Sequence, residues 1–546
     1  MGLSCRNRVH VRRFRRGGAG ENKSACPYKR GGLEIMTSAN LLMLIAIIIY
    51  LAGMIAIGWI YSKRTSNVGD FYLGGRKLGP LTTAMSAEAS DMSSWLLLGL
   101  PGVAYISGIA DAAWTAIGLA VGTYLNWLIV AKRIRAYTAH VNAITVPDFF
   151  SKRYHDKRNL LSCIAALVII IFFVPYTASG FAACGKLFKS LFGLDYTAAM
   201  LLSAVVIVGY TVLGGFMAAS MTDLIQSIVM TIALIVVFAF GISAAGGLGA
   251  VMENARALPG YLKLTECFDI GSGSASPYGF LTIVSTLAWG LGYFGMPHVL
   301  LRFMAIGDAQ KLKLSRRVAS VWVVISMAAA VMIGVVGNAL SKVGAVESFT
   351  TSSEAETIII RIADLIASHG WLAALVGGMI LAGILAATMS TADSQLLAAS
   401  SSVSQNLFRD FLHIRMSKRT EMVLARGSVV AISIIAAFIA ADPNSSVFNI
   451  VSFAWAGFGA AFGPVVLLAL FWRRSNQAGA LAGMVAGGAM VFIWKYLVRP
   501  LGGAWNIYEL LPAFIIACAV NVLVSLLTPA PDKAVTDEFD AVKAKF

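Results

Sequence analysis

Long apolar segments separated by short polar ones run through almost the whole chain. A bilayer core about 30 Å thick is crossed by a helix of roughly 20 apolar residues. Segments of this kind occur at 40–61, 81–106, 112–130, 160–180, 197–213, 224–246, 278–304, 318–341, 371–395, 424–441, 447–471, 477–497 and 507–528. The pattern predicts an all-α polytopic membrane protein with about 13 transmembrane helices.

Composition excludes an ordinary soluble protein. Apolar residues make up 58% of the chain and charged residues 13%, and the mean hydropathy is +0.77, whereas soluble domains are roughly 45–50% apolar and about 25% charged. The net charge of +16 comes from short basic clusters between apolar segments, which form no extended nucleic-acid-binding face. The six cysteines show no metal-ligand spacing. We also find no catalytic triad or P-loop, so we expect neither an enzyme nor a cofactor.

The distribution of Lys and Arg predicts the orientation in the membrane. An odd number of spans places the two termini on opposite sides. One set of alternate loops carries more than three times as many Lys and Arg residues as the other set, and basic loops stay in the cytoplasm. We therefore expect the N-terminus of the first span outside and the C-terminus in the cytoplasm.

The chain divides into three parts. Residues 1–35 form a basic leader that conflicts with an external N-terminus, and we expect translation to start at Met36, with the leader disordered or a start-site artefact. Residues 36–530 form the transporter domain, and 531–546 form a short cytoplasmic tail. The longest loops, 247–277 and 343–370, are too short for a soluble domain, and we see no sign of an obligate protein partner.

Two spans contain charges and helix-breaking residues. The second reads LTTAMSAEASDMSSWLLLGLPG and includes Glu88 and Asp91, and the seventh includes WGLGYFGMPHVLLRF. A charge at mid-bilayer is costly unless it faces a cavity or an ion, although Gly and Pro kinks also serve simple packing. Because the two spans lie five apart, they predict two five-helix repeats, at about 81–246 and 278–471. Interrupted helices at matching places in two repeats are typical of a transporter's central site.

The ninth span ends in GILAATMSTADSQLLAASSS and is rich in oxygen ligands. Ser390 and Thr391 offer hydroxyl groups, and Ala387 offers a carbonyl one turn earlier. A hard cation such as sodium prefers several oxygen ligands. The same hydroxyls could instead bond back to their own helix.

These segments, with LGGRKLGP and FAWAGFGAAFGPVVL, resemble the sodium:solute symporter family, and within it the bacterial proline symporters, from about residue 40 to 530. The resemblance implies an inverted-repeat fold of the LeuT type, with one helix before the core and two after it. It also implies a multi-pass protein of a bacterial inner membrane, with sodium and L-proline as its ligands and lipid as its surroundings.

The resemblance further implies roles for individual residues. It places sodium near Ala89, Asp91, Met92, Ala387, Ser390 and Thr391. It places the substrate near Ser93, Trp95, Tyr176, Trp289, Tyr293 and Pro297. It assigns to Arg76 a role in coupling sodium to solute transport. It also matches Asp223 to an acid that helps to form a second sodium site in some relatives.

Several positions depart from the family pattern. They are Glu88, Ser94, Met296, Asp393 and Ser394. If Asp393 lies near Asp223, the two carboxylates share one environment, and with Ser394 they could hold a second cation or a proton. We hypothesise such a site.

The expected function is sodium-coupled import of L-proline by alternating access. A relative of the same fold could carry another small solute, such as pantothenate, a monocarboxylate or a sugar. A channel or a membrane sensor is a further alternative from a different class.

Overall fold

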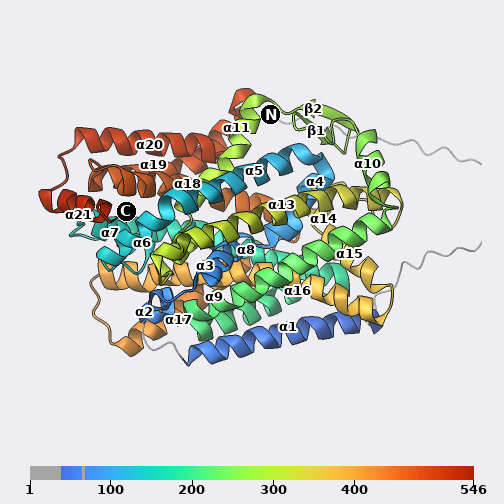
Figure 1. Ribbon diagram of the computed structural model, residues 1–546, viewed down its shortest axis with the longest axis horizontal. Coiled ribbons are helices and arrows are strands. Elements are labelled where there is room, and N and C mark those ends of the chain that lie inside the picture. The colour runs from blue at the N-terminus through green and yellow to red at the C-terminus, as the bar shows by residue number, and fades with distance from the viewer. Residues whose placement is uncertain (1–37, 64–67, 546) are drawn as a thin grey trace, which may run out of the picture. The chain divides into compact units, whose positions relative to one another are not determined.

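The computed structural model describes residues 38–63 and 68–545 (Figure 1). The predicted leader, 1–35, lies outside the described residues. The long helices are α1 (Ser38–Ser62), α5 (Ile109–Leu125), α8 (Leu160–Phe192), α9 (Tyr196–Ala244), α13 (Leu312–Lys342), α16 (Trp371–Ser401), α17 (Lys418–Ile439), α18 (Val447–Phe471), α19 (Gln477–Ile493) and α20 (Leu510–Leu527). Ten helices of the described residues are long and apolar enough to cross a membrane, or eleven if one bent pair counts as a span.

Shorter elements connect the long ones. They are α2 (Val68–Leu73), α3 (Pro80–Asp91), α4 (Leu100–Ser107), α6 (Ala131–His140), α7 (Val146–Arg153), α10 (Leu248–Ala257), β1 (Glu266–Asp269), β2 (Ser274–Pro277), α11 (Phe280–Leu287), α12 (Pro297–Ala305), α14 (Ser352–Ala355), α15 (Ile358–Ala367) and α21 (Lys533–Lys543). Helices α6, α7 and α21 gather at one end of the bundle, which we call the tail end (Figure 1). Helices α10, α14 and α15 and the antiparallel strands β1 and β2 gather at the other, the hairpin end.

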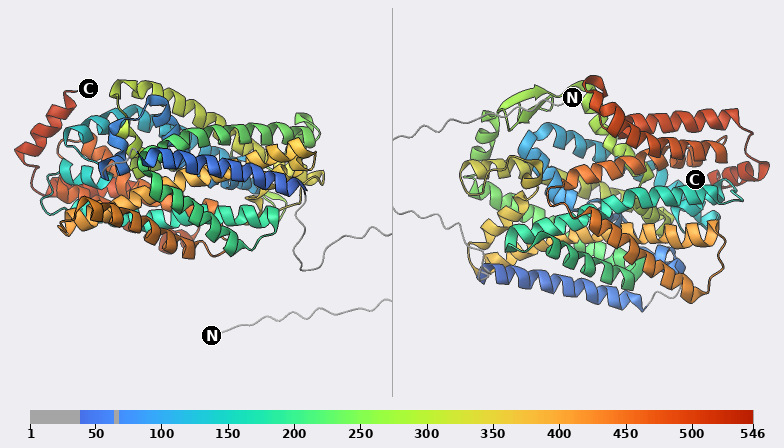
Figure 2. Two further views of the ribbon diagram at one scale, coloured as in Figure 1. Left: turned by 90° about the horizontal axis from the view of Figure 1, so that it is seen from below. Right: turned by 180° about the vertical axis from the view of Figure 1, so that it is seen from behind.

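Burial distinguishes the central helices from the peripheral ones. In the most apolar stretch of α18, 83% of the residues are buried, whereas in α1 only 22% are. Helix α1 lies on one side of the bundle, and α19 and α20 lie on the opposite side (Figure 2). Exposed apolar residues on α1 such as Ile48 and Ile49 suit contact with lipid tails. The central helices are the ones that can build a site away from lipid.

The two interrupted spans are confirmed as broken helices. Helix α3 ends at Asp91, Met92 has a non-helical backbone (φ −80°, ψ 74°), and a π-helical turn, Trp95–Gly99, leads into α4. In the seventh span, α11 runs into a 3-10 segment, Ala288–Gly295, and α12 begins at Pro297 with a bend of 46°. Breaks of this kind expose main-chain groups that cannot be satisfied by the helix itself.

The fifth and sixth expected spans form one element, α9, so the connection expected at 214–223 is helical except at one residue. Gly215 has φ 64° and ψ −167°, a backbone conformation that glycine adopts without a steric penalty. A straight helix of 49 residues would be about 74 Å long, more than twice the bilayer core. Gly215 therefore divides α9 into two segments without a loop.

A buried ion pair fixes the hairpin end. Lys186 Nζ of α8 lies 2.6 Å from Glu356 Oε2, and both side chains are almost fully buried. Glu356 also accepts hydrogen bonds from the Ser446 hydroxyl and from the backbone N–H groups of Val447 and Phe448, at the start of α18. A carboxylate at a helix N-terminus is stabilised by the unpaired N–H groups there. Glu356 thus joins α8, α18 and the segment between α14 and α15.

We expect Glu356→Gln to lower the free energy of unfolding by about 3–5 kcal/mol, because it leaves the buried Lys186 ammonium without its counter-charge. Thermal unfolding in detergent measures the change. The exposed pair Lys263–Glu266 supplies a control, because Glu266→Gln should change stability by no more than about 1 kcal/mol. Equal effects of the two substitutions would contradict this account.

Candidate functional site

The break after α3 gathers polar groups around Asp91. Its backbone carbonyl accepts hydrogen bonds from the Trp95 indole N–H (3.1 Å) and from the Tyr176 hydroxyl of α8 (3.2 Å). Trp95 and Tyr176 are both about 1% exposed. Two of the residues expected to contact substrate therefore hold the unwound end of α3 in place.

The Asp91 side chain joins the two broken helices. Its Oδ2 accepts a hydrogen bond of 2.5 Å from the Tyr293 hydroxyl, which belongs to the 3-10 segment Ala288–Gly295. Its Oδ1 is buried and has no hydrogen-bond partner among the described residues. A buried polar atom of this kind is rare and calls for an explanation. One carboxylate oxygen thus links the helices, and the other is available to a ligand.

Residues of α16 meet the same end of α3. The Ser390 hydroxyl lies 2.7 Å from the Ala89 carbonyl oxygen and 3.1 Å from the Ala387 carbonyl oxygen. Thr391 Oγ1 is buried and, within the described part of the chain, has no hydrogen-bond partner. Three of the expected sodium ligands, Ala89, Ala387 and Ser390, thus meet where α3 and α16 are in contact, and each offers an oxygen atom.

Aromatic side chains surround the broken segments. The ring centroids of Trp95 and Trp289 are 6.3 Å apart, and Trp289 stacks on Tyr508 at 5.1 Å. Trp455 of α18 donates its indole N–H to the Trp289 carbonyl (2.7 Å) and meets the Tyr293 ring edge to face. Neither Trp455 nor Tyr508 is assigned a role by the sequence pattern.

The aromatic cluster is closed toward the hairpin end. A cavity of about 170 Å³ there is lined by residues of α4 and α18 and of the segments beside them, among them Gly99, Glu356 and Phe448. The Phe448 ring lies 5.4 Å from the Trp289 ring, and Trp289 is only 4% exposed. These two rings separate the cavity from the central residues.

Arg76 links three chain segments at the tail end. Its guanidinium donates hydrogen bonds to the carbonyl oxygens of Thr138, Ala143 and Met304, at 2.9, 2.6 and 2.8 Å. The first two residues lie at and after the end of α6, and Met304 is in α12. Arg76 therefore ties the chain before α3 to the end of the other broken helix, far from the aromatic cluster.

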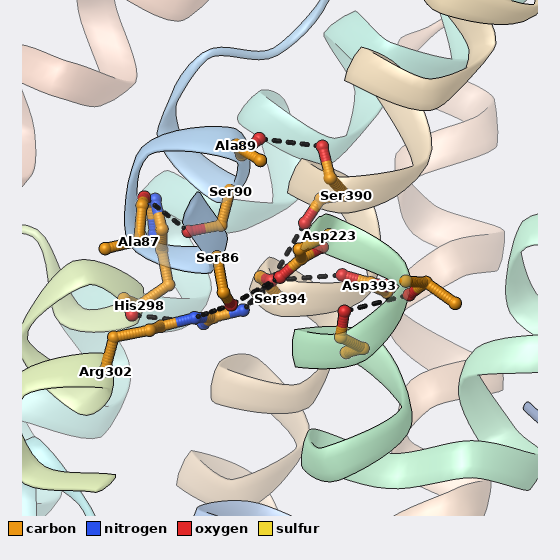
Figure 3. A network of polar contacts seen from close by, with 12 residues as sticks. Ser86, Ala87, Ala89, Ser90, Asp223, His298, Arg302, Ser390, Asp393 and Ser394 are labelled. Atoms are coloured by element: carbon orange, nitrogen blue, oxygen red, sulfur yellow. Dashed lines mark hydrogen bonds and ion pairs between the residues drawn. The ribbon is translucent and has the colours of Figure 1, made fainter. Parts of the chain in front are cut away.

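A buried polar network lies beside Ser390 and contains a basic residue that sequence reasoning did not single out (Figure 3). Arg302 of α12 is 1% exposed, and its Nη2 lies 3.1 Å from Asp223 Oδ2 and 2.5 Å from Ser394 Oγ. Asp393 belongs to the same network through a 3.0 Å contact with Ser394. An arginine within an apolar span was the signal that could have identified it.

Glu88 is separate from this network. It is fully buried and accepts hydrogen bonds from the Trp127 indole (2.8 Å) and the Thr123 hydroxyl (3.1 Å). Met296, another departure from the family pattern, is buried directly before Pro297 at the start of α12. Ser94 lies in the break between α3 and the π-helical turn.

Comparison with solved structures shows which fold the chain has. A Na+-coupled sialic acid symporter, solved in a substrate-bound outward-open state, matches with a TM-score of 0.73 at 16% identity, over 90% of this chain and 99% of that one. A nucleobase-cation-symport-1 family transporter in a closed conformation matches with a TM-score of 0.51 at 13% identity, over 86% and 98% of the two chains. The architecture is therefore that of a LeuT-like transporter.

Comparison with curated sequences is more specific. The osmoregulated proline transporter OpuE of Bacillus subtilis is 40% identical over 90% of this chain and 96% of its own length. The sodium/proline symporter of Escherichia coli is 40% identical over 92% and 97% of the two chains, and the high-affinity proline transporter PutP of Bacillus subtilis is 41% identical over 89% and 98%. The sequence profile of the sodium:solute symporter family matches residues 71–487. The chain therefore belongs to the sodium:solute symporter family.

Proposed function

We propose that the chain is a sodium-coupled symporter that imports L-proline across a bacterial inner membrane by alternating access. One observation carries the proposal. The Asp91 carboxylate joins two broken helices through Tyr293, and Ser390 brings α16 against the Ala89 carbonyl at the same break. Proline as the solute is supported by relatives about 40% identical that are named for proline transport.

Sodium would bind where α3 and α16 face each other. The carbonyl oxygens of Ala89, Met92 and Ala387 and the hydroxyls of Ser390 and Thr391 would supply its ligands, with the Asp91 carboxylate close by. The unpartnered Thr391 and Asp91 oxygens support this assignment, because sodium is a hard ion that binds oxygen atoms. Sodium bound there would stabilise the bent form of α3 and so order the neighbouring solute pocket.

Proline would bind beside this position, among Ser93, Trp95, Tyr176, Trp289, Tyr293 and Pro297. Proline is a compact zwitterion with an apolar ring. Aromatic faces suit the ring and its ammonium group, and free N–H groups at a helix start suit the carboxylate. Phe448 and Trp289 cover this position on the hairpin side, as alternating access requires whenever that side is closed.

We further propose thirteen spans, with the N-terminus of α1 outside and the C-terminus in the cytoplasm. The helices support that number if α3 and α4 count as one broken span and if α9 counts as two spans divided at Gly215. The core would consist of two repeats of five spans. The basic residues around α6, α7 and α21 lie at the tail end, and basic segments remain cytoplasmic.

Uptake of labelled proline into proteoliposomes tests the function. An inward sodium gradient should drive accumulation, and choline in place of sodium should abolish it. Competition by unlabelled proline, pantothenate, monocarboxylates and sugars identifies the solute. Equal uptake in sodium and choline would overturn sodium coupling. If another solute inhibits uptake and unlabelled proline does not, proline is not the transported solute.

We expect Ser390→Ala to raise the sodium concentration needed for half-maximal uptake about tenfold, because one oxygen ligand, worth roughly 1.4 kcal/mol, is lost. The apparent affinity for proline at saturating sodium should change much less. Sodium titrations of initial uptake rates measure the effect. Ser402→Ala should leave the titration unchanged, because this buried serine lies about 18 Å further along, where α16 passes into a π-helical segment (Ser402–Phe411). An equal shift in both variants would contradict the assignment.

A further inference from the structure

The network around Arg302 lies next to the proposed sodium position. On both α3 and α16, a residue of the network is about one helical turn from an expected sodium ligand. On α3, Ser86 precedes Ala89 by three residues, and on α16, Ser394 follows Ser390 by four. The Ser394 hydroxyl lies 2.8 Å from the Ser390 carbonyl oxygen, so the two positions share a backbone. Helical geometry separates them by about 5 Å.

Within the described residues, the Arg302 guanidinium donates hydrogen bonds to four oxygen atoms. Its Nε donates to Ser86 Oγ (3.0 Å), its Nη1 to the His298 carbonyl (3.1 Å), and its Nη2 to Asp223 Oδ2 and Ser394 Oγ. The Ser86 hydroxyl in turn donates to Asp223 Oδ2 (2.6 Å). Carboxylate, hydroxyl and carbonyl oxygens are the same ligands that a sodium ion would use.

Of the two carboxylates in this network, Asp223 is paired with a positive charge, and Asp393 is bonded by hydroxyl groups. Asp223 and Asp393 are both fully buried, and the Tyr210 hydroxyl donates to Asp393 Oδ2 (2.6 Å). Arg302 is the basic side chain that contacts this group (Figure 3). Buried charges in proteins are paired or bound to a metal, and arginine keeps its charge under all ordinary conditions.

We propose that the Arg302 guanidinium is a built-in cation, which holds the position beside Asp223, Asp393 and Ser394 and so excludes a second sodium ion from it. The transporter then couples each solute molecule to one sodium ion. Arg302 acts as a specificity-determining residue for the coupling stoichiometry, and the second cation site expected from the two aspartates is filled by the protein itself. This inference rests on the proposed function as a sodium symporter.

The physical reason is competition for the same oxygens. A second sodium ion would have to displace the guanidinium from Asp223 and Ser394 and would lie close to a positive charge that cannot be neutralised by loss of a proton. When the guanidinium is removed, the two aspartates keep their oxygens but lose their counter-charge. A small cation can then take its place.

Paired fluxes of radioactive sodium and labelled proline, measured in proteoliposomes at a clamped membrane potential, test the inference with the full-length chain. We expect one sodium ion per proline in the wild type, with a Hill coefficient of 1 for sodium. Arg302→Gln should raise the ratio to two and make the sodium dependence sigmoidal. Arg302→Lys, which keeps the charge, should retain a ratio of one.

Three outcomes would overturn the inference: a ratio of two in the wild type, a ratio of two in Arg302→Lys, or a ratio of one with an unchanged sodium titration in Arg302→Gln. If Arg302→Gln does not fold, the charge-balanced variant Arg302→Gln/Asp393→Asn replaces it, because this variant keeps the Asp223 carboxylate that the guanidinium contacts. A ratio of two in that variant supports the inference, and a ratio of one with an unchanged sodium titration contradicts it. Wild-type protein that shows no sodium-dependent proline uptake would instead refute the proposed function, so the two failures are distinguishable.

Discussion

Replacing Asp91 with asparagine should reduce sodium-dependent proline uptake by about 10- to 100-fold, since hydrogen bonds to a charged group contribute roughly 1.5–3 kcal/mol. The carboxylate holds the Tyr293 hydroxyl at 2.5 Å and offers its second oxygen to a ligand. Asparagine keeps the shape but removes the charge that attracts a cation. Initial rates of uptake in proteoliposomes, normalised to the amount of inserted protein, measure the loss.

Glu88 provides a matched control for this substitution. It is a second fully buried carboxylate on α3, one turn before Asp91. Its oxygens are already bonded by Trp127 and Thr123, and glutamine can keep the same contacts. Glu88→Gln should therefore leave most of the uptake intact. Equal losses from both substitutions would show that the loss of any charge on α3 disables the protein. That result would refute a specific role of the Asp91 carboxylate in sodium-dependent uptake.

Gly290→Ala should prevent stable folding or lower the free energy of unfolding by about 2–4 kcal/mol, beyond the usual cost of overpacking. A methyl group at Gly290 would lie 2.2 Å from the Gly118 carbonyl oxygen of α5. The facing position is equally tight, because a methyl group at Gly122 would lie 2.3 Å from the Gly290 carbonyl oxygen. Both clashes involve backbone atoms, which cannot rotate away.

Thermal unfolding in detergent and the yield of folded protein measure this effect. Gly488→Ala in α19 is the control, because a methyl group there would have its nearest neighbour at 3.9 Å. Alanine in a helix with open space is tolerated or slightly stabilising. A Gly290→Ala protein as stable as the control would contradict the close packing of α5 against the broken helix.

Most of the fold could be predicted from the sequence because the bilayer restricts the choices. An apolar segment of about 20 residues in lipid must be a helix that satisfies its own backbone. For this reason the span expected at 447–471 coincides with α18. The connection expected between the fifth and sixth spans was wrong, because a single glycine with positive φ, Gly215, turns the chain without a loop.

The site was only partly predictable, for a different reason. Charged and hydroxyl residues at the break of α3 stood out, since such residues are costly in lipid without a function. The Gly and Pro residues before α12 stood out because they interrupt a helix. Their partners did not stand out. Trp455, Tyr508 and Phe448 are ordinary aromatic residues in apolar segments, and only the packing of α18 and α20 against the broken helices shows that they border the site.

The sequence by itself determined that the chain lies in a membrane, that two of its helices are interrupted, and that side chains rich in oxygen lie at the interruptions. Each of these conclusions follows from a local property, namely hydropathy, helix-breaking residues or side-chain chemistry. Only the tertiary structure decided that Arg302 lies against Asp223, 79 positions away in the chain. Charge pairing depends on distance in space, and no local pattern encodes which buried cation reaches which buried carboxylate.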